Sequence, residues 1–143
     1  MIQKCYFGAF VACLTFSAPA LAFEPADLQR LKEKNACSNP CDLTGAELSD
    51  SNLNYANLTS AKLNGANLSF ATLNGANMSV ADLSGADLSG ADMRGAMLNF
   101  ANLSDANLGN ADLTGADLTG TNLNGAFLCD TTMPDGFVLY SGC

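Results

Sequence analysis

The sequence repeats a five-residue unit 18 times without an insertion, from Cys41 to Asp130. Two adjacent copies, ADLSG and ADLSG, are identical and run from Ala81 to Gly90. The third residue of the unit is Leu in 16 copies and Met in two, the first is Ala in 15, and the fifth is Gly in nine. Repetition at so short and constant a period is typical of a solenoid, in which every unit occupies an equivalent position.

Neither a straight helix nor a flat strand can use this period. In an α-helix successive Leu residues would be rotated by about 500° and would never form a stripe. In a flat strand an odd period would place alternate Leu residues on opposite faces. The pattern is satisfied if the chain bends in the same sense after every unit, because every Leu then points into one interior. The sequence therefore predicts Leu along an axis, Ala where the walls come close, and Gly at the tightest turns.

The unit A-(D/N)-L-x-x resembles that of the pentapeptide-repeat family. The resemblance implies an all-β fold, a right-handed quadrilateral β-helix in which four units form one coil and the chain returns above itself every 20 residues. It also implies that the Leu and the preceding Ala face inward. Eighteen units would form about 4.5 coils, and at about 4.8 Å per coil the rod would be about 22 Å long.

A stack of coils exposes backbone at both ends, which therefore need covers. Residues 23–40 are expected to form a short N-terminal cap helix and linker, with Leu28 and Leu31 on one face and basic residues toward the end of the helix. Residues 131–143, in which Pro134 interrupts the pattern, are expected to form a C-terminal partial coil and cap.

Residues 1–22 have the anatomy of a secretory signal peptide. An apolar run from Tyr6 to Phe16 follows a single Lys, and small residues precede the expected cleavage site after Ala22. The run of about 11 residues is shorter than the roughly 20 that a membrane-spanning helix needs. A membrane anchor and a lipoprotein signal with Cys13 as the modified residue are the alternatives. Cleavage predicts an exported protein, in a periplasm, a lumen or outside the cell, with no remaining membrane attachment.

Four cysteines follow the predicted cleavage site. Cys37 and Cys41 lie just before the repeat, and Cys129 and Cys143 lie at its end. In an oxidising compartment this placement favours the pairs Cys37–Cys41 and Cys129–Cys143, although four cysteines allow three pairings. A zinc site made from all four is the alternative, and it would require the two ends of the repeat to meet.

Residues 20 apart should stack in columns on the outside of the rod. One column of fifth-position residues contains Val80 and Phe100, and Met97 belongs to the same face. We expect these three to form an outward apolar patch, which is a candidate interaction surface. Acidic residues are mostly separated within a column by Asn, Thr or Lys. The direct pair is Asp92 over Asp112, which we interpret as solvated because two exposed carboxylates make a poor cation site.

The sequence contains no histidine, which removes the commonest general base and metal ligand. Flat or convex solenoid walls also offer no cleft for a reaction. We therefore expect no catalytic residue, no cofactor and no metal. The favoured function is a non-enzymatic, exported structural or protein-interaction module with an unknown protein partner, no nucleic-acid partner and a possible homodimer.

The family resemblance implies an alternative function, since some members protect DNA gyrase by imitating duplex DNA. Removal of Lys4 with the signal peptide changes the net charge from −8 to about −9, and this acidity is compatible with a mimic that binds gyrase or a topoisomerase. The predicted export and the short rod both oppose this alternative.

Overall fold

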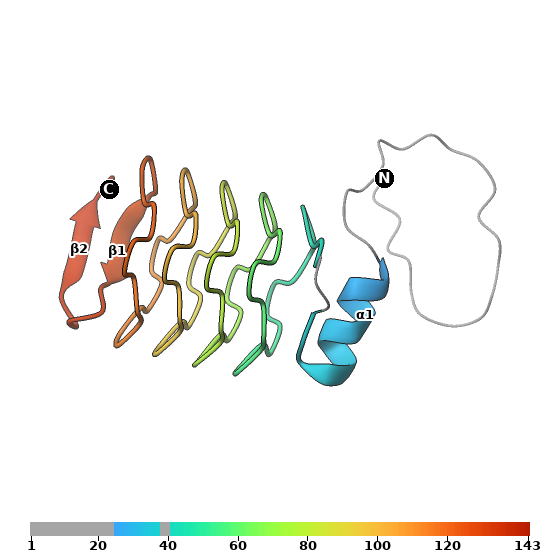
Figure 1. The fold of residues 1–143 in the computed structure, drawn as a ribbon. Helices are drawn as coiled ribbons and strands as arrows, with labels where there is room; N and C mark the ends of the chain where they lie inside the picture. Colours follow the sequence, from blue (N-terminus) through green and yellow to red (C-terminus); the bar gives the residue numbers. More distant parts are fainter. Residues whose placement is uncertain (1–24, 38–40) are drawn as a thin grey trace, which may run out of the picture.

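The computed structural model describes residues 25–37 and 41–143, so the predicted signal peptide lies outside the described residues. The chain forms a rod of stacked coils (Figure 1). Helix α1 (Pro25–Lys34) lies at one end, and strands β1 (Leu128–Thr132) and β2 (Val138–Ser141) lie at the other. Within the described ranges no helix has the length and apolar character needed to cross a membrane.

Backbone hydrogen bonds between residues about 20 apart hold the coils together. Parallel bridges join second-position residues of successive coils, as between Asp82 and Asn102. The amide of Leu83 donates to the carbonyl of Asn102 at 2.8 Å, and the amide of Asn102 donates to the carbonyl of Ala81 at 2.9 Å. Four units therefore form one coil, and the fold is the expected right-handed quadrilateral β-helix.

Each corner of the coil requires a left-handed backbone conformation. All 18 fifth-position residues, from Gly45 to Asp130, have φ between 55° and 75°. The corner is a turn in which the first residue of the next unit donates to the third-position carbonyl, as from Ala46 to Leu43 at 3.0 Å. Positive φ at the third residue of such a turn favours Gly, because Gly has no Cβ to clash. This requirement explains why Gly is the commonest fifth residue.

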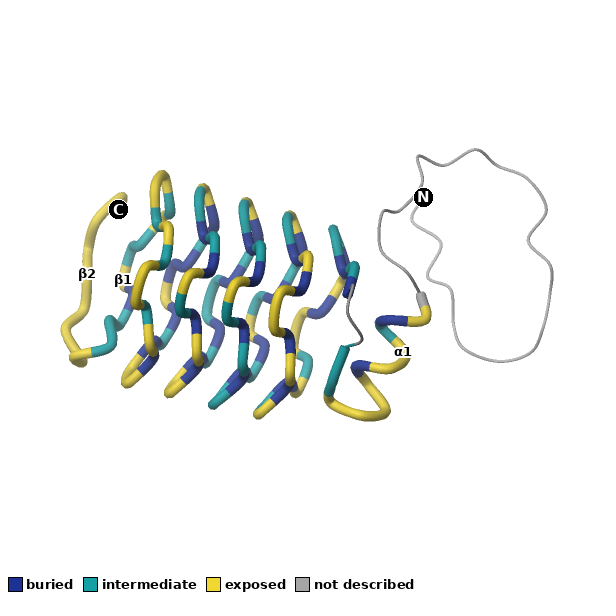
Figure 2. Tube along the Cα trace, in the orientation of Figure 1, coloured by how far each residue is buried: buried dark blue, intermediate teal, exposed yellow. Residues whose placement is uncertain are grey.

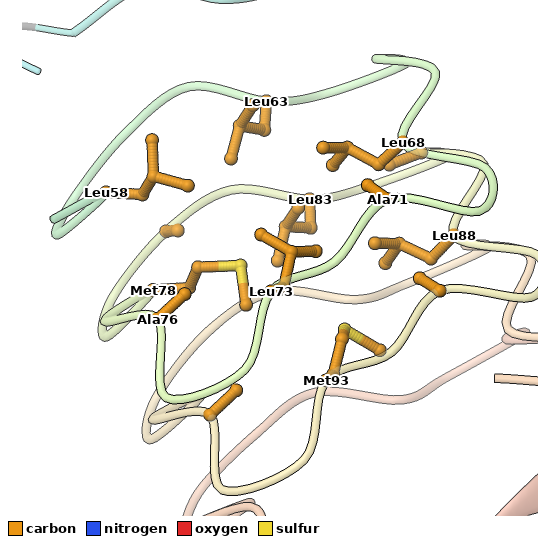
Figure 3. Close-up of a cluster of buried hydrophobic side chains, with 14 of the residues drawn as sticks. Leu58, Leu63, Leu68, Ala71, Leu73, Ala76, Met78, Leu83, Leu88 and Met93 are labelled. Atoms are coloured by element: carbon orange, nitrogen blue, oxygen red, sulfur yellow. The ribbon is translucent and has the colours of Figure 1, made fainter. Parts of the chain in front are cut away.

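The core is the column of inward third- and first-position side chains. Third-position residues from Leu43 to Leu113 are at most 3% exposed, and first-position Ala residues from Ala56 to Ala111 are at most 1% exposed. Figure 3 shows these side chains pointing into the rod from successive coils, with Met78 and Met93 in Leu positions. Each fully buried Leu contributes roughly 1.5–3 kcal/mol. The predicted lining is confirmed.

Helix α1 covers the first coil, as expected. Leu31 is 1% exposed and belongs to the core. Asn35 follows the last helical residue, Lys34, and its φ of 51° is the left-handed conformation that commonly follows a helix C-terminus. The carbonyl of Asn35 then accepts the amide of Asn57 at 3.0 Å, and the buried carboxylate of Asp27 accepts the amide of Asp42 at 3.1 Å. The helical cap is therefore hydrogen-bonded to the coils it covers.

The last coil extends beyond the predicted end of the repeat at Asp130. Thr132 bridges Asp112, and the amide of Gly115 donates to the carbonyl of Pro134 at 2.9 Å. The chain then reverses, and β2 pairs antiparallel with β1. These residues complete a coil and extend one wall, but they do not close the end of the core. Four interior side chains there are only partly buried: Leu118, Leu123, Leu128 and Met133.

Candidate functional site

The predicted patch lies on one side wall of the rod, which we call the Val80 wall and which consists of residues 56–60, 76–80, 96–100 and 116–120. The side chains of Val80, Met97 and Phe100 are 57%, 41% and 64% exposed. They belong to two adjacent coils, because the amide of Val80 donates to the carbonyl of Asn99 at 3.0 Å. The structure therefore places all three outward on one wall.

Exposed aromatic residues at fifth positions cover glycines of the next coil. A Cβ added to Gly120 would lie 2.6 Å from the ring of Phe100, which means that the ring occupies the space above that glycine. The same arrangement occurs on two other walls. The pairs of aromatic residue and covered glycine are Tyr55 and Gly75, Phe70 and Gly90, and Phe100 and Gly120. These rings therefore have a structural role in shielding a turn.

Val80 has no such structural role. The residue 20 positions later is Phe100, so Val80 shields no glycine. Its φ of 60° is unfavourable for a β-branched side chain, and a left-handed conformation costs roughly 1–2 kcal/mol in a residue other than Gly. Packing within the rod therefore gives no reason for an outward Val at a position that favours Gly.

The Val80 wall is also nearly free of charge. Asp117 is its single ionisable side chain, whereas each of the other walls carries several. The Thr119 hydroxyl and amide hydrogen-bond the Asp117 carboxylate and lower its pKa. The single charge of this wall lies beside the patch, because Asp117 bridges Met97 of the adjacent coil.

Several acidic residues on the other walls are paired with amides or cations. Asn102 donates to Asp82 across adjacent coils at 3.1 Å. Lys62 approaches Asp42 at 3.4 Å. Hydrogen bonds from Thr44, together with the charge of Lys62, lower the pKa of Asp42. The predicted separation of acids by hydrogen-bonding side chains is therefore present along the stack.

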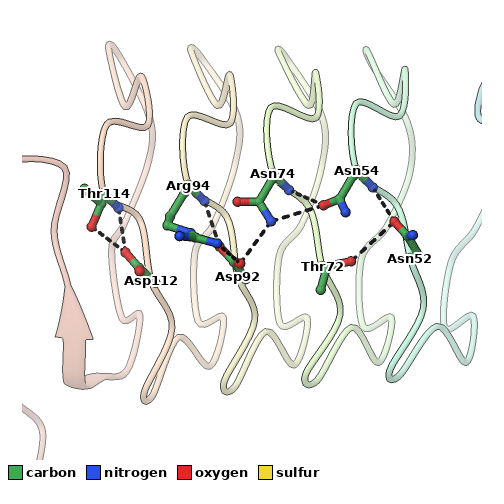
Figure 4. Close-up of polar contacts among 8 residues, drawn as sticks. All are labelled: Asn52, Asn54, Thr72, Asn74, Asp92, Arg94, Asp112 and Thr114. Atoms are coloured by element: carbon green, nitrogen blue, oxygen red, sulfur yellow. Dashed lines mark hydrogen bonds and ion pairs between the residues drawn. The ribbon is translucent and has the colours of Figure 1, made fainter.

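The carboxylates of Asp92 and Asp112 accept hydrogen bonds from neighbouring residues of the protein. The Arg94 guanidinium donates to both oxygens of Asp92 at 2.8 and 2.7 Å, and Asn74 adds a bond at 2.9 Å (Figure 4). The Arg94 hydrogen bonds, followed by that from Asn74, lower the pKa of Asp92 to about 2. Asp112 accepts the amide and hydroxyl of Thr114. Asp92 is thus hydrogen-bonded to the preceding coil, whereas the Asp112 carboxylate is hydrogen-bonded within its own unit.

The four cysteines form two local disulfides, one at each end of the repeat. Cys37 is bonded to Cys41, and Cys129 is bonded to Cys143. In the described part of the chain, the group with metal-ligand geometry is Cys129, Asp130 and Cys143. Its two sulfurs are bonded to each other, so they provide no thiolates for a metal.

Sequence reasoning missed a hollow of about 610 Å³ between α1 and the first coil. Its lining includes Leu31 and Lys34 of the cap region and Leu48, Leu53 and Asn54 of the coil. The repeat pattern carries no signal for it, because its shape depends on how the helix packs against the coil.

The comparisons with known proteins agree with this geometry. The family model described as pentapeptide repeats matches residues 41–79, 61–99, 79–115 and 96–133. No curated protein gives a significant match.

Solved structures of pentapeptide repeat proteins are similar to this chain. HetL, a pentapeptide repeat protein involved in heterocyst differentiation regulation from the cyanobacterium Nostoc sp. strain PCC 7120, is 33% identical with a TM-score of 0.50. The match covers 73% of this chain and 66% of HetL, slightly less than two thirds of that protein. Another Nostoc pentapeptide repeat protein, alr5209, is 35% identical with a TM-score of 0.58, covering 67% of this chain and 90% of that one. This chain belongs to the pentapeptide-repeat family.

Proposed function

We propose that the protein is a non-catalytic, exported protein-binding rod that contacts its partner through Val80, Met97 and Phe100. The observation that carries this proposal is Val80, an exposed β-branched side chain held at a φ of 60°. Gly occupies half of the equivalent positions and would avoid the backbone strain. A side chain that is unfavourable for the fold and exposed to solvent is explained if it serves an interaction.

The surroundings of the patch support a protein partner. Three large exposed apolar side chains lie on a wall with one ionisable residue. Depletion of charged residues is typical of the centre of a protein interface. Phe100 contributes an aromatic side chain, the kind of residue that is enriched at interface centres.

The two disulfides support an oxidising compartment for the proposed function. Disulfides persist in secreted, periplasmic and lumenal proteins and are rare in a reducing cytosol. The Cys37–Cys41 bond joins the segment that follows α1 to the first repeat unit, and the Cys129–Cys143 bond joins Cys143 to β1. Export would therefore stabilise both ends of the rod.

The partner surface is tested by capture of binding proteins with matched variants. Phe100→Asp should lose the captured partner, because it places a charge in the centre of the patch. Tyr55→Asp changes a more exposed aromatic residue, at 78%, on another wall and should retain the partner. Equal recovery by Phe100→Asp and the unaltered protein would refute the assignment of the patch.

Localisation is tested separately by cell fractionation and by mass spectrometry of the N-terminus. The proposal expects the protein outside the cytoplasm, beginning at Phe23. A cytoplasmic protein with residues 1–22 intact would refute export. That result would favour the acidic gyrase- or topoisomerase-binding alternative, which an assay of gyrase inhibition would then test.

A further inference from the structure

The two ends of the core are covered to different degrees. At the α1 end, Leu43, Leu48 and Leu53 are at most 3% exposed. At the opposite end, the equivalent residues of the last coil are partly exposed, whereas those one coil earlier are fully buried. The difference arises because no further layer covers the last coil. The partly exposed residues are Leu118, Leu123, Leu128 and Met133.

Strand β2 borders this open end and has one unpaired edge. In the described part of the chain, β2 belongs to a two-stranded sheet and pairs with β1 alone. All four of its residues are exposed, as Figure 2 shows along its whole length. An exposed strand edge is a template for pairing with another strand.

The sequence of this edge lacks two residue types that commonly block pairing. Lys and Pro are absent from residues 137–141. The segment instead exposes four apolar side chains in succession, at 72%, 41%, 36% and 69% for Phe137, Val138, Leu139 and Tyr140. A monomeric protein would leave both an apolar surface and a strand edge in water.

We propose that two copies of the chain associate tail to tail through antiparallel pairing of their β2 edges. A two-fold axis lets the same strand serve both sides of the interface. Pairing centred on Leu139 places Val138 of one copy opposite Tyr140 of the other, which is a favourable combination of β-branched and aromatic side chains. The same contact brings the two open core ends toward each other.

The exposed apolar surface around β2 approaches the area at which specific interfaces begin. With roughly 150–250 Å² per aromatic side chain, Phe137 and Tyr140 at 72% and 69% exposure offer about 210–350 Å² per copy. Two copies therefore offer about 420–700 Å² from these residues alone. Val138, Leu139 and the partly exposed core bring the total toward the roughly 1,200 Å² at which specific interfaces begin.

The charges near β2 give the association a distinctive salt dependence. Asp130 lies in β1 and Asp135 lies in the turn that joins β1 to β2, and both are exposed. A tail-to-tail pair brings these acids of both copies closer, and salt screens their repulsion. The dimer should therefore tighten as ionic strength rises, whereas a complex held by opposite charges would weaken.

Sedimentation equilibrium of the oxidised protein, as recovered from cells, tests the proposal. We expect a concentration-dependent dimer that is favoured at about 0.5 M over about 0.05 M salt. Leu139→Lys should raise the dissociation constant about tenfold or more, because it places a charge on the pairing edge. Tyr55→Lys, on a side wall, is the matched control and should leave the constant unchanged. Circular dichroism confirms folding, and Tyr140→Lys replaces Leu139→Lys if that variant unfolds.

Small-angle scattering of the same samples distinguishes this dimer from one formed by the Val80 wall. Tail-to-tail pairing nearly doubles the maximum dimension of the rod, whereas side-by-side pairing increases its cross-section. A monomer at about 1 mM protein in high salt, a widened dimer, or a dimer that survives both Lys substitutions would overturn the proposal. The partner-capture result for Phe100→Asp is independent of each of these outcomes.

Discussion

The identical units Ala81–Gly85 and Ala86–Gly90 allow the energy of a ring over a glycine to be measured within one coil. Gly85 and Gly90 have φ of 62° and 65°, so Ala at either position meets the same backbone penalty. A Cβ at Gly85 has no atom within 4 Å, whereas a Cβ at Gly90 would lie 2.6 Å from the Phe70 ring. Gly90→Ala must therefore displace that ring, and Gly85→Ala need not.

The expected magnitudes follow from these contacts. A left-handed conformation costs Ala roughly 1–2 kcal/mol, which is partly offset because Ala also restricts the unfolded chain, so Gly85→Ala should destabilise by about 1 kcal/mol. Phe70 is 64% exposed, so about one third of its burial energy of roughly 1.5–3 kcal/mol is at stake. Gly90→Ala should therefore cost about 0.5–1 kcal/mol more than Gly85→Ala.

Urea unfolding followed by circular dichroism measures both costs. Repeating the Gly90→Ala substitution in a Phe70→Ala background completes a double-mutant cycle, and there its cost should fall to that of Gly85→Ala. Equal costs for the two glycines in the unaltered protein, or an excess at Gly90 that persists without Phe70, would refute the role given to the ring.

Three further perturbations test the core, the hydrogen-bonded carboxylate of Asp92 and the disulfide at the C-terminal end. Leu83→Ala, at a fully buried site, should lower the free energy of unfolding, measured in urea, by about 3 kcal/mol. Leu118→Ala, in the partly exposed last coil, should lower it by about half as much. Equal losses would contradict an open end of the core. Asp92→Asn should cost about 0.5–1 kcal/mol at pH 7. Because the folded-state pKa of Asp92 is about 2, below its ordinary 3.8, this contribution is present above about pH 4 and is lost as the pH falls toward 2. The difference in unfolding free energy between the two proteins should therefore shrink over that range, and a constant difference would exclude the ionised carboxylate as its source. Replacing Cys129 and Cys143 by Ser should lower the free energy of unfolding by about 2–3 kcal/mol. It should also accelerate amide hydrogen exchange in β2 more than in the central coils. Uniform acceleration would contradict a local role of this disulfide.

The fold could be predicted from the sequence because every unit is subject to the same constraints. Leu at the third position and Ala at the first recur without an insertion, so the period itself specifies the interior. The N-terminal helical cap could also be predicted from the sequence, because Leu28 and Leu31 share one face of the helix. Both residues contact the core in the structure. Local pattern and global packing agree in these regions.

The C-terminal end could not be predicted in the same way because the pattern fades after Asp130. Its backbone is determined by a chain reversal at Gly136, where φ is 85°, and by the antiparallel pairing of β2 with β1. Both depend on the geometry of the last coil. The sequence of residues 131–143 does not indicate that the core side chains of the last coil remain partly exposed.

The candidate site could be predicted in part by aligning residues that are 20 positions apart in the sequence. These columns placed Val80 and Phe100 together before any side-chain direction was known. They also contained the pairing of Phe100 with Gly120, but its meaning depends on the ring leaning toward the following coil. Only the structure separates a ring that shields a turn from a Val with no such role.

The ladder of bridges between residues 20 apart imposes two different rules on changes in chain length. Inserting or deleting one unit of five preserves the lining, because every unit presents the same Leu and Ala to the axis. The change nevertheless moves every later unit to the neighbouring wall of the rod. Deletion of one unit between Val80 and Phe100 would therefore place these two residues on different sides of the rod. Only a change of 20 residues preserves both the interior and the alignment of the surface. The rod can therefore change length without unfolding, but the arrangement of its outer walls survives only when whole coils are gained or lost.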